Sequence, residues 1–301
     1  MASGSRRLLP FAFTGALTLV LALVGSGLWF LVRPLSDPGR EGDGDEDRNG
    51  QVRLMLAGDS MTHGADGDRT WRYHLWNHLE PHVDGLDFVG PYTAPATPEQ
   101  IVPPEMVGAD PSEGDPDSVD YRDPDFDQDH NARWGRTLAD ATTTITSDVA
   151  EHRPDVLCVM IGLNDLLYPV TDREMEERIR AYVEGAREAN PNIRVLFAQA
   201  LPITMAERDE GFALRLYVYN ELVHKLTREL SSARSPVVGL DLAGAESWNV
   251  ETDTYDGTHP NDAGELKIAA GFADALSDAF GLGPGYPRPL PIAPVPSTDT
   301  S

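Results

Sequence analysis

Apolar runs of strand length alternate along this chain with segments that have helical spacing. Five runs are typical of strands, at residues 52–57, 86–89, 156–161, 193–200 and 237–242. The run at 156–161 has no polar interruption, as expected of a central parallel strand covered on both faces. Helical patterns follow, the first with Trp71, Leu75 and Leu79 at a spacing of four. The series predicts an α/β fold, a three-layer α/β/α sandwich with a five-stranded parallel sheet and right-handed crossovers.

The charge of the chain excludes one class of partner. The sequence has 49 acidic and 24 basic residues, a formal net charge of −25. This charge repels phosphate backbones, so we expect no nucleic-acid binding. Cys158 is the only cysteine, so no intrachain disulfide can form and packing must supply the stability. The sequence does not indicate an oligomeric state.

The N-terminal segment, residues 1–35, is predicted to be a transmembrane anchor. Arg6 and Arg7 precede an apolar run at 8–32, and about 20 such residues suffice to cross a bilayer. A cleavable signal peptide is the alternative, although its apolar region usually has only ~7–15 residues. In both cases the arginines stay in the cytoplasm and the acidic bulk is exported. The expected location is extracytoplasmic, anchored to the cell membrane, or secreted if the segment is cleaved.

Composition divides the rest of the chain into three parts. Residues 36–50 are rich in Asp, Glu and Gly and almost lack apolar side chains, which predicts a solvated acidic linker. Residues 51–283 contain the strand and helix series and are predicted to form one domain. Residues 284–301 contain too much proline for a helix or a central strand, and they are predicted to form a tail or an extension along the surface.

Polar residues with catalytic potential follow two of the predicted strands and precede the last predicted helix. Ser60 follows the first strand, Asn164 follows the third, and His259 precedes the last helix. In a parallel sheet these strand ends meet at one edge, where ligands bind. Asp256 lies three residues before His259, so its carboxylate can reach Nδ1 and leave Nε2 free to act as a base. Taken singly, Ser60 can be an ordinary helix cap and Asn164 an Asx turn.

Together, the segments around these residues resemble the first, third and fifth blocks of the SGNH (GDSL-type) hydrolase family. The matching segments are Gly58-Asp59-Ser60-Met61-Thr62, Gly162-Leu163-Asn164-Asp165 and Asp256-Gly257-Thr258-His259-Pro260. They occur in the family's order, and the resemblance spans most of the predicted domain. It implies a serine esterase on a flavodoxin-like sheet, with no metal and no cofactor.

The resemblance implies a role for each matching residue. Ser60 would be the nucleophile, His259 the general base and acid, and Asp256 the carboxylate that orients the imidazole. The oxyanion would bind to the backbone N–H of Ser60, to Asn164 and to the backbone N–H of a glycine from the second block. We assign that glycine to Gly135, because an oxyanion donor must sit on a loop that enters a helix. Gly90, which directly follows the second predicted strand, is the alternative.

Several segments together look similar to the acetyl xylan esterase and carbohydrate esterase branch of the family: Phe88-Val89-Gly90, the Asp-rich approach to His130, Pro154-Asp155-Val156, Tyr219-Asn220 and Asp256 to Pro260. The resemblance therefore implies a serine esterase for short-chain, acetyl-type esters, on carbohydrate. Three aromatic residues are candidates for stacking on sugar rings, or else half-buried packing residues: Trp134, Tyr168 and Trp248. A lipase or thioesterase on the same scaffold is the alternative, and a non-catalytic surface binding module is another.

Two patterns resemble metal sites. Asp123, Asp125, Asp127 and Asp129 alternate, but this loop lacks the glycine and glutamate of a calcium-binding EF-hand, which favours a solvated acidic loop. Calcium binding by residues 105–129 stays open. His74 and His78 have the spacing of a zinc pair without an apparent third ligand, so we expect no metal there.

Overall fold

A parallel sheet forms the centre of the structure, a computed structural model that describes residues 50–101 and 119–291. The strands are β1 (Val52–Gly58), β2 (Leu86–Phe88), β3 (Asn131–Ala132), β4 (Val156–Met160), β5 (Arg194–Ala198) and β6 (Val237–Leu240). They are arranged in the order β2-β1-β4-β5-β6, with β3 paired to β1, and all pairs are parallel. The predicted α/β fold is confirmed, with six strands in place of five. The sixth is β3, which is too short to appear as an apolar run.

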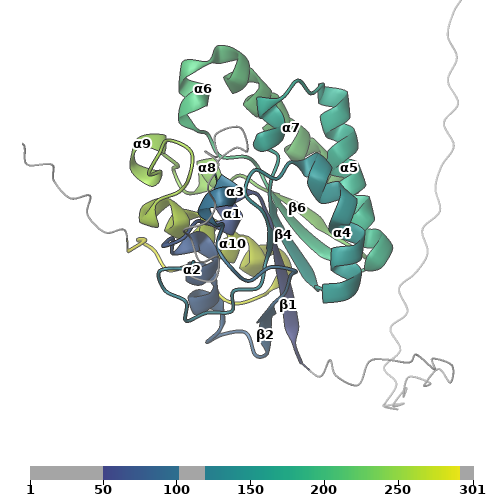
Figure 1. Cartoon of the computed structure of the whole chain (residues 1–301). Coiled ribbons are helices and arrows are strands. Elements are labelled where there is room, and N and C mark those ends of the chain that lie inside the picture. Colours follow the sequence, from purple (N-terminus) through teal and green to yellow (C-terminus); the bar gives the residue numbers. More distant parts are fainter. Residues whose placement is uncertain (1–49, 102–118, 292–301) are drawn as a thin grey trace, which may run out of the picture. The chain divides into compact units, whose positions relative to one another are not determined.

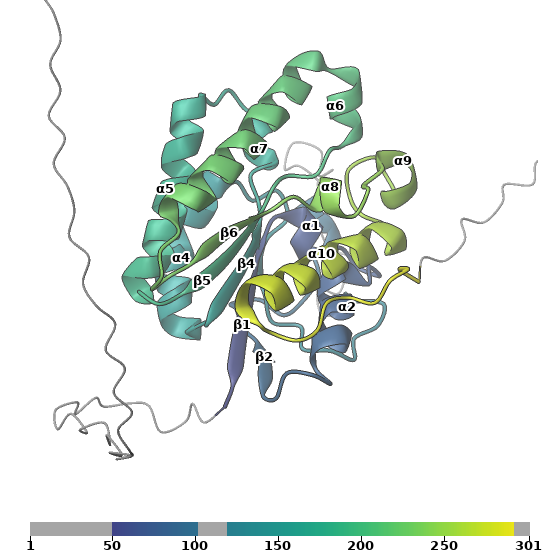
Figure 2. The same cartoon turned by 180° about the vertical axis from the view of Figure 1, so that it is seen from behind.

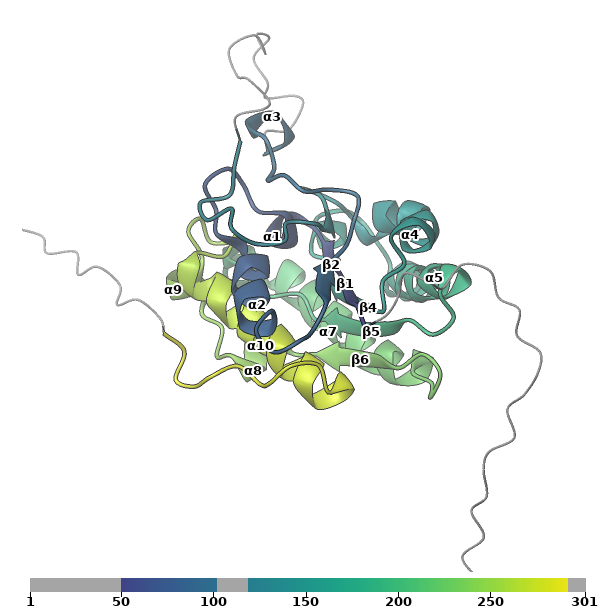
Figure 3. The same cartoon turned by 90° about the horizontal axis from the view of Figure 1, so that it is seen from below.

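Helices cover both faces of the sheet, so the domain has the three predicted layers (Figures 1 and 2). One layer contains α2 (Thr70–Leu79) and α10 (Asp262–Phe280). The other contains α4 (Leu138–His152), α5 (Asp172–Ala189) and α7 (Glu210–Leu230). Figure 3 shows the two layers on either side of the strands. The remaining helices are short: α1 (Ser60–His63), α3 (Pro98–Ile101), the 3-10 helix η3 (Asn164–Leu167), α6 (Thr204–Arg208), α8 (Leu242–Ala245) and α9 (Val250–Asp253).

Local sequence signals explain where the main elements begin and how they pack. All residues of β4 are buried, as its uninterrupted apolar sequence predicts. Thr171 caps α5 and forms a capping box with Glu174, a reciprocal pair of side-chain to backbone hydrogen bonds. Between α2 and α10, the Trp71 ring stacks on Phe272 with centroids 4.6 Å apart. The core therefore fills the space between the sheet and each helical layer.

The register of the sheet decides which loops lie near the end of β1. Phe88, the last residue of β2, pairs with Leu54 in the middle of β1. In contrast, β3 pairs with Ala57 and Gly58 at the carboxyl end of β1, on the same side as β2. The chain that leaves β3 therefore lies beside the turn after β1. The chain that leaves β2 starts opposite the middle of β1 instead.

Several sequence predictions fall wholly or partly outside the described residues. These are the anchor at 1–35, nearly all of the linker at 36–50, the tail from residue 292 and most of the loop at 105–129. Before residue 292, Arg288 forms ion pairs with Glu246 and Asp274, which is on α10. Among the helices of residues 50–101 and 119–291, none combines the length and the apolar character needed to cross a membrane.

Candidate active site

Ser60 lies on a tight turn between β1 and α1. A side chain at Gly58 would place its Cβ 2.4 Å from the carbonyl oxygen of Met160, so only glycine fits there. Asp59 is the N-cap of α1, and its Oδ1 accepts a hydrogen bond of 3.1 Å from the backbone N–H of Met61. Burial raises the pKa of Asp59 to about 7. The turn thus presents Ser60 as the first residue of a short helix at the sheet edge.

His259 connects Ser60 to Asp256. Its Nε2 atom lies 3.0 Å from Ser60 Oγ, and its Nδ1 atom lies 2.7 Å from Asp256 Oδ2. The other oxygen of Asp256 accepts hydrogen bonds from the backbone N–H groups of Thr258 and His259. Burial raises the pKa of Asp256, but the hydrogen bonds from His259 outweigh it and hold this pKa below its usual value. Asp256 is therefore ionised at neutral pH and can support a positive charge on the imidazole.

The loop that carries His259 is closed by backbone contacts. Tyr255 N–H donates to the carbonyl of His259 at 3.0 Å, and Thr254 forms an isolated bridge with Pro260. Next in the chain, Asn261 caps α10 through its side chain. These contacts hold His259 at the start of α10, facing the turn after β1.

Asn164 is the first residue of η3, which begins four residues after the end of β4 at Met160. Its Nδ2 donates a hydrogen bond of 3.2 Å to the carbonyl of Arg136, on the loop between β3 and α4. Gly162 before it has φ +108, and a Cβ there would lie 2.3 Å from the hydroxyl of Tyr219. The Asn164 side chain is thus held against the loop that contains Gly135.

The two candidate glycines of the second block have different environments. Gly135 is exposed, has φ +70, and lies on the loop after β3, where Arg133 N–H donates to the Gly58 carbonyl at 3.3 Å. Gly90 is buried, and a Cβ there would lie 2.2 Å from the carbonyl oxygen of His130. Gly135 lies near the turn of Ser60, whereas Gly90 packs against the entry to β3.

The aromatic candidates occupy three different places. The Trp134 ring stacks on His259, with centroids 4.4 Å apart and an interplanar angle of 27°. Trp248 is partly buried against the core, and its Nε1 donates to the Pro202 carbonyl at 3.0 Å. Tyr168 follows η3 and is 64% exposed. Of the three, Trp134 is the one whose ring contacts His259.

Two residues that the sequence interpretation did not assign also belong to this region. The Tyr255 ring lies 5.8 Å from the His259 ring at an interplanar angle of 21°, and Tyr255 is 52% exposed. Asp165 is fully buried and accepts hydrogen bonds from Leu138 N–H, at the start of α4, and from Arg178. The available signal was adjacency to an assigned residue, since Asp165 directly follows Asn164 and Tyr255 directly precedes Asp256.

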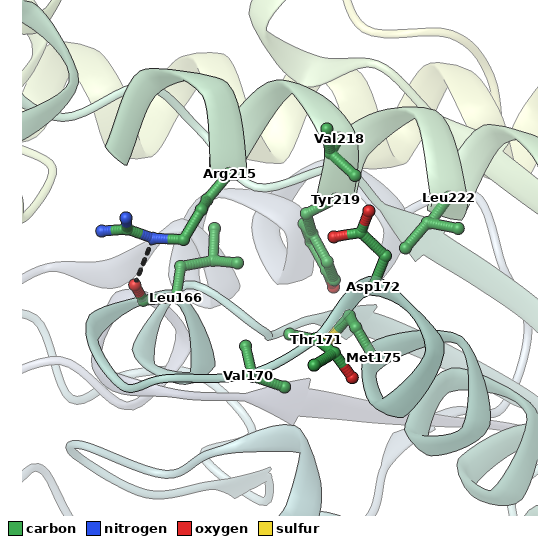
Figure 4. A pocket seen from close by; sticks show the side chains of 9 residues that line it. All are labelled: Leu166, Val170, Thr171, Asp172, Met175, Arg215, Val218, Tyr219 and Leu222. Atoms are coloured by element: carbon green, nitrogen blue, oxygen red, sulfur yellow. Dashed lines mark hydrogen bonds between the residues drawn. The ribbon is translucent and has the colours of Figure 1, made fainter. Parts of the chain in front are cut away.

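A small pocket lies behind η3, between the start of α5 and α7 (Figure 4). Leu166, Val170 and Leu222 are among the apolar side chains that line it. Arg215 lies at one side, and its Nε donates to the Leu166 carbonyl at 3.1 Å. The pocket therefore adjoins the same short helix that begins with Asn164.

The predicted acidic loop has partners within the protein. Asp123 pairs with Arg69 at 2.5 Å, and Asp127 accepts a hydrogen bond of 2.9 Å from the backbone N–H of Phe88. In the described parts of the chain, no three His, Cys, Asp or Glu side chains are grouped so that they could hold a metal ion. Asp123 and Asp127 thus have structural contacts within the chain.

Comparison with known proteins identifies relatives of this arrangement. The model of the GDSL-like Lipase/Acylhydrolase family matches residues 116–266, half of the chain, including Gly135, Asn164, Asp256 and His259. The match begins after Ser60. Comparison with curated proteins gives no match.

Three solved structures share the fold. A crystal structure of an acetyl esterase mutant with acetate ion has 23% identity and a TM-score of 0.55, covering 73% of this chain and 94% of that one. A carbohydrate esterase family 3 protein from Talaromyces cellulolyticus has 24% identity and a TM-score of 0.56, with coverages of 74% and 94%. A family 3 carbohydrate esterase from Clostridium thermocellum has 22% identity and a TM-score of 0.55, with coverages of 76% and 96%. At these identities the likeness shows the fold alone.

Proposed function

Because this chain belongs to the GDSL-like lipase/acylhydrolase family and is therefore an ester-bond hydrolase, we propose that it is a serine esterase that removes acetyl and other short acyl groups from carbohydrates. The observation that carries the catalytic part is the continuous hydrogen-bonded series from Ser60 through His259 to Asp256. It lies at the carboxyl edge of the sheet, where parallel α/β folds bind ligands.

In the proposed mechanism, Ser60 Oγ attacks the ester carbonyl while His259 Nε2 takes the hydroxyl proton. His259 then returns this proton to the leaving alcohol, and an acyl-enzyme remains on Ser60. A water molecule, deprotonated by the same nitrogen, then attacks the acyl-enzyme, and His259 passes this proton to Ser60 Oγ as the acid is released. Asp256 holds the imidazole in the orientation that leaves Nε2 facing Ser60 and stabilises its positive charge in both steps.

Three donors are proposed for the oxyanion: the backbone N–H groups of Ser60 and Gly135 and the Nδ2 of Asn164. The hydrogen bond from Asn164 to the Arg136 carbonyl supports this set, because it places the amide beside the residue that follows Gly135. The register of β3 supports Gly135 over Gly90, since the loop after β3 starts at the end of β1 and the loop after β2 does not. Loss of one such donor typically lowers turnover ~10²–10³-fold.

Two observations support a carbohydrate ester as the substrate. Two of the similar structures are described as family 3 carbohydrate esterases and one as an acetyl esterase. In addition, Tyr255 exposes an aromatic ring beside His259, which must protonate the leaving alcohol. An exposed aromatic face at this place suits a sugar ring, whose apolar C–H face packs against aromatic rings.

The pocket behind η3 favours a second candidate, a lipase or thioesterase. Its Leu166, Val170 and Leu222 side chains are apolar, and Leu166 belongs to η3 (Figure 4). A lipase or thioesterase would need an apolar wall of this kind close to Ser60, because each methylene group that is buried contributes about 0.8 kcal/mol to binding of a longer acyl chain. The two candidates therefore differ in the length of the acyl group that they accept.

An acyl-length series separates these candidates. We expect kcat/KM on p-nitrophenyl esters to fall from two to eight acyl carbons, and acetate to be released from an acetylated polysaccharide. A steady rise of kcat/KM along the same series, without release of acetate from the polysaccharide, would contradict the proposed carbohydrate esterase and favour the lipase alternative.

We further propose that residues 1–35 anchor the enzyme in the cell membrane and that its hydrolase domain, residues 51–283, is extracytoplasmic. The support is the apolar run at 8–32, which follows Arg6 and Arg7. The full chain should then sediment with membranes and resist extraction by high salt. A soluble form that begins after about residue 26 would indicate cleavage and secretion.

A further inference from the structure

His63 lies on the same short helix as Ser60, and its ring is fixed by two hydrogen bonds. Its Nδ1 lies 3.0 Å from the backbone nitrogen of Trp134, and its Nε2 lies 3.1 Å from the carbonyl oxygen of Ala94. A backbone N–H can only donate and a carbonyl can only accept, so Nδ1 is the acceptor and Nε2 carries the proton. Burial and the nearby Arg72 lower the pKa of His63 to about 4, which keeps this neutral form at neutral pH.

The backbone beneath the His63 ring is also held in place. The buried Arg72 donates from Nε to the Thr62 carbonyl at 2.9 Å and from its terminal nitrogen to the His63 carbonyl at 3.3 Å. The hydroxyl of Tyr121 donates to the same His63 carbonyl at 2.8 Å. These bonds anchor the C-terminal end of α1, so the His63 ring has little freedom to follow a displaced partner.

The partner of His63, Trp134, connects to the chemistry in two ways. Its ring stacks on His259 at 4.4 Å, and its backbone directly precedes Gly135, the proposed oxyanion donor. The hydrogen bond from Trp134 N–H to His63 therefore joins the helix of the nucleophile to the loop that contacts the base and the oxyanion. Residues 63 and 134 are 71 positions apart in sequence, and the bond is part-buried.

We infer that His63 is a positioning residue, which sets the distance between the Ser60 helix and the Trp134–Gly135 loop by accepting the hydrogen bond from Trp134. The inference rests on the proposed roles of Ser60, Gly135 and His259. Without this bond the loop loses one of its links to the Ser60 helix and keeps the hydrogen bond of 3.3 Å from Arg133 N–H to the Gly58 carbonyl, so the position of Trp134 relative to Ser60 is less well fixed. A misplacement of about 1 Å at a catalytic group can lower a rate ~10²-fold, so we expect kcat to fall about 10- to 100-fold with KM changed less than about threefold.

The test compares three substitutions in the full chain, with p-nitrophenyl acetate as substrate. His63→Leu removes both hydrogen bonds. His63→Asn places an amide oxygen where Nδ1 stands and keeps an acceptor for Trp134 N–H, so it should restore most of kcat. His63→Gln places its amide near Nε2, keeps a donor for Ala94 and lacks the acceptor, so it should resemble His63→Leu in kcat.

His130 provides a matched control. It is also buried, its ring lies 5.1 Å from that of His63, and its Nε2 contacts the same Ala94 carbonyl at 3.3 Å, but its Nδ1 contacts Ala132 N–H instead of Trp134. We expect His130→Leu to lower the melting temperature about as much as His63→Leu while leaving kcat higher. Equal losses of kcat in the two leucine variants would reduce His63 to a packing residue and overturn the inference.

The remaining outcomes separate this inference from the proposed function. If His63→Leu does not fold, the Asn and Gln variants decide, because equal kcat values in those two would overturn the inference. If Ser60→Ala is inactive and His63→Leu keeps its kcat, the inference alone fails. If Ser60→Ala stays active, the proposed function and the inference fail together.

Discussion

The Nε2 atom of His259 lies 3.0 Å from the Oγ atom of Ser60, although 199 residues separate them in the chain. The turn after β1 supplies the hydroxyl, and the loop before α10 supplies the imidazole. Because the second imidazole nitrogen contacts Asp256 at 2.7 Å, the ring is oriented with Nε2 toward Ser60. This arrangement leads to predictions about each of the three residues.

Replacement of Ser60 by alanine should abolish ester hydrolysis, because the acyl-enzyme forms on its oxygen. The side chain is small and lies at the edge of the sheet, so the circular-dichroism spectrum and the melting temperature should stay close to those of the wild type. Turnover of p-nitrophenyl acetate is the measurement. A folded Ser60→Ala protein with wild-type turnover would rule out the serine mechanism. A wild-type chain without turnover that still binds a carbohydrate would favour the binding-module alternative.

Replacement of Asp256 by asparagine should lower kcat by up to ~10⁴, because asparagine cannot stabilise the imidazolium and favours the wrong tautomer. His259→Ala sets the scale, since it removes the base itself. Asp262→Asn is a control, because Asp262 is an exposed carboxylate on the first turn of α10 that pairs with Arg122. A loss below about tenfold in Asp256→Asn would indicate a Ser-His dyad.

Replacement of Tyr255 by leucine should impair hydrolysis of an acetylated oligosaccharide more than hydrolysis of triacetin, which has no sugar ring. The reason is the exposed ring beside His259, at the place where the leaving alcohol takes its proton. We expect KM for the oligosaccharide to rise about tenfold, which corresponds to roughly 1.4 kcal/mol of lost binding. Tyr217→Leu, at another exposed tyrosine, is the control. Equal losses on both substrates would show that Tyr255 acts through His259 instead.

Replacement of His74 by leucine should stabilise the protein in acid. Burial lowers the pKa of His74 to about 4 from an ordinary value of 6.5, so protonation favours the unfolded chain. The stabilising contribution of the neutral ring is present above pH 6.5 and is lost as the pH falls toward 4. Urea unfolding of wild type should show this loss between pH 6.5 and 4, and the variant should show less of it. His82→Leu, at an exposed histidine nearby, controls for added apolar surface.

The order of the main strands and helices along the chain was predictable, because buried segments have apolar patterns that are visible in short stretches of sequence. A strand such as β4, covered on both faces, must be apolar throughout, and the capping box of α5 needs only Thr171 and Glu174. The positions of Ser60, Asn164 and His259 were likewise predictable, since each is tied to a strand end or a helix start next to it in sequence.

The tertiary structure decided everything that depends on residues far apart in the chain. β3 has two residues and exists only because β1 offers them a partner, and this pairing places Gly135 rather than Gly90 beside the turn of Ser60. The contacts of Trp134 with His63 and with His259 also join segments that are distant in sequence. Apolar periodicity reports which side of an element is buried, but it does not report which element covers it. The choice of partners therefore comes from the packing of the whole domain.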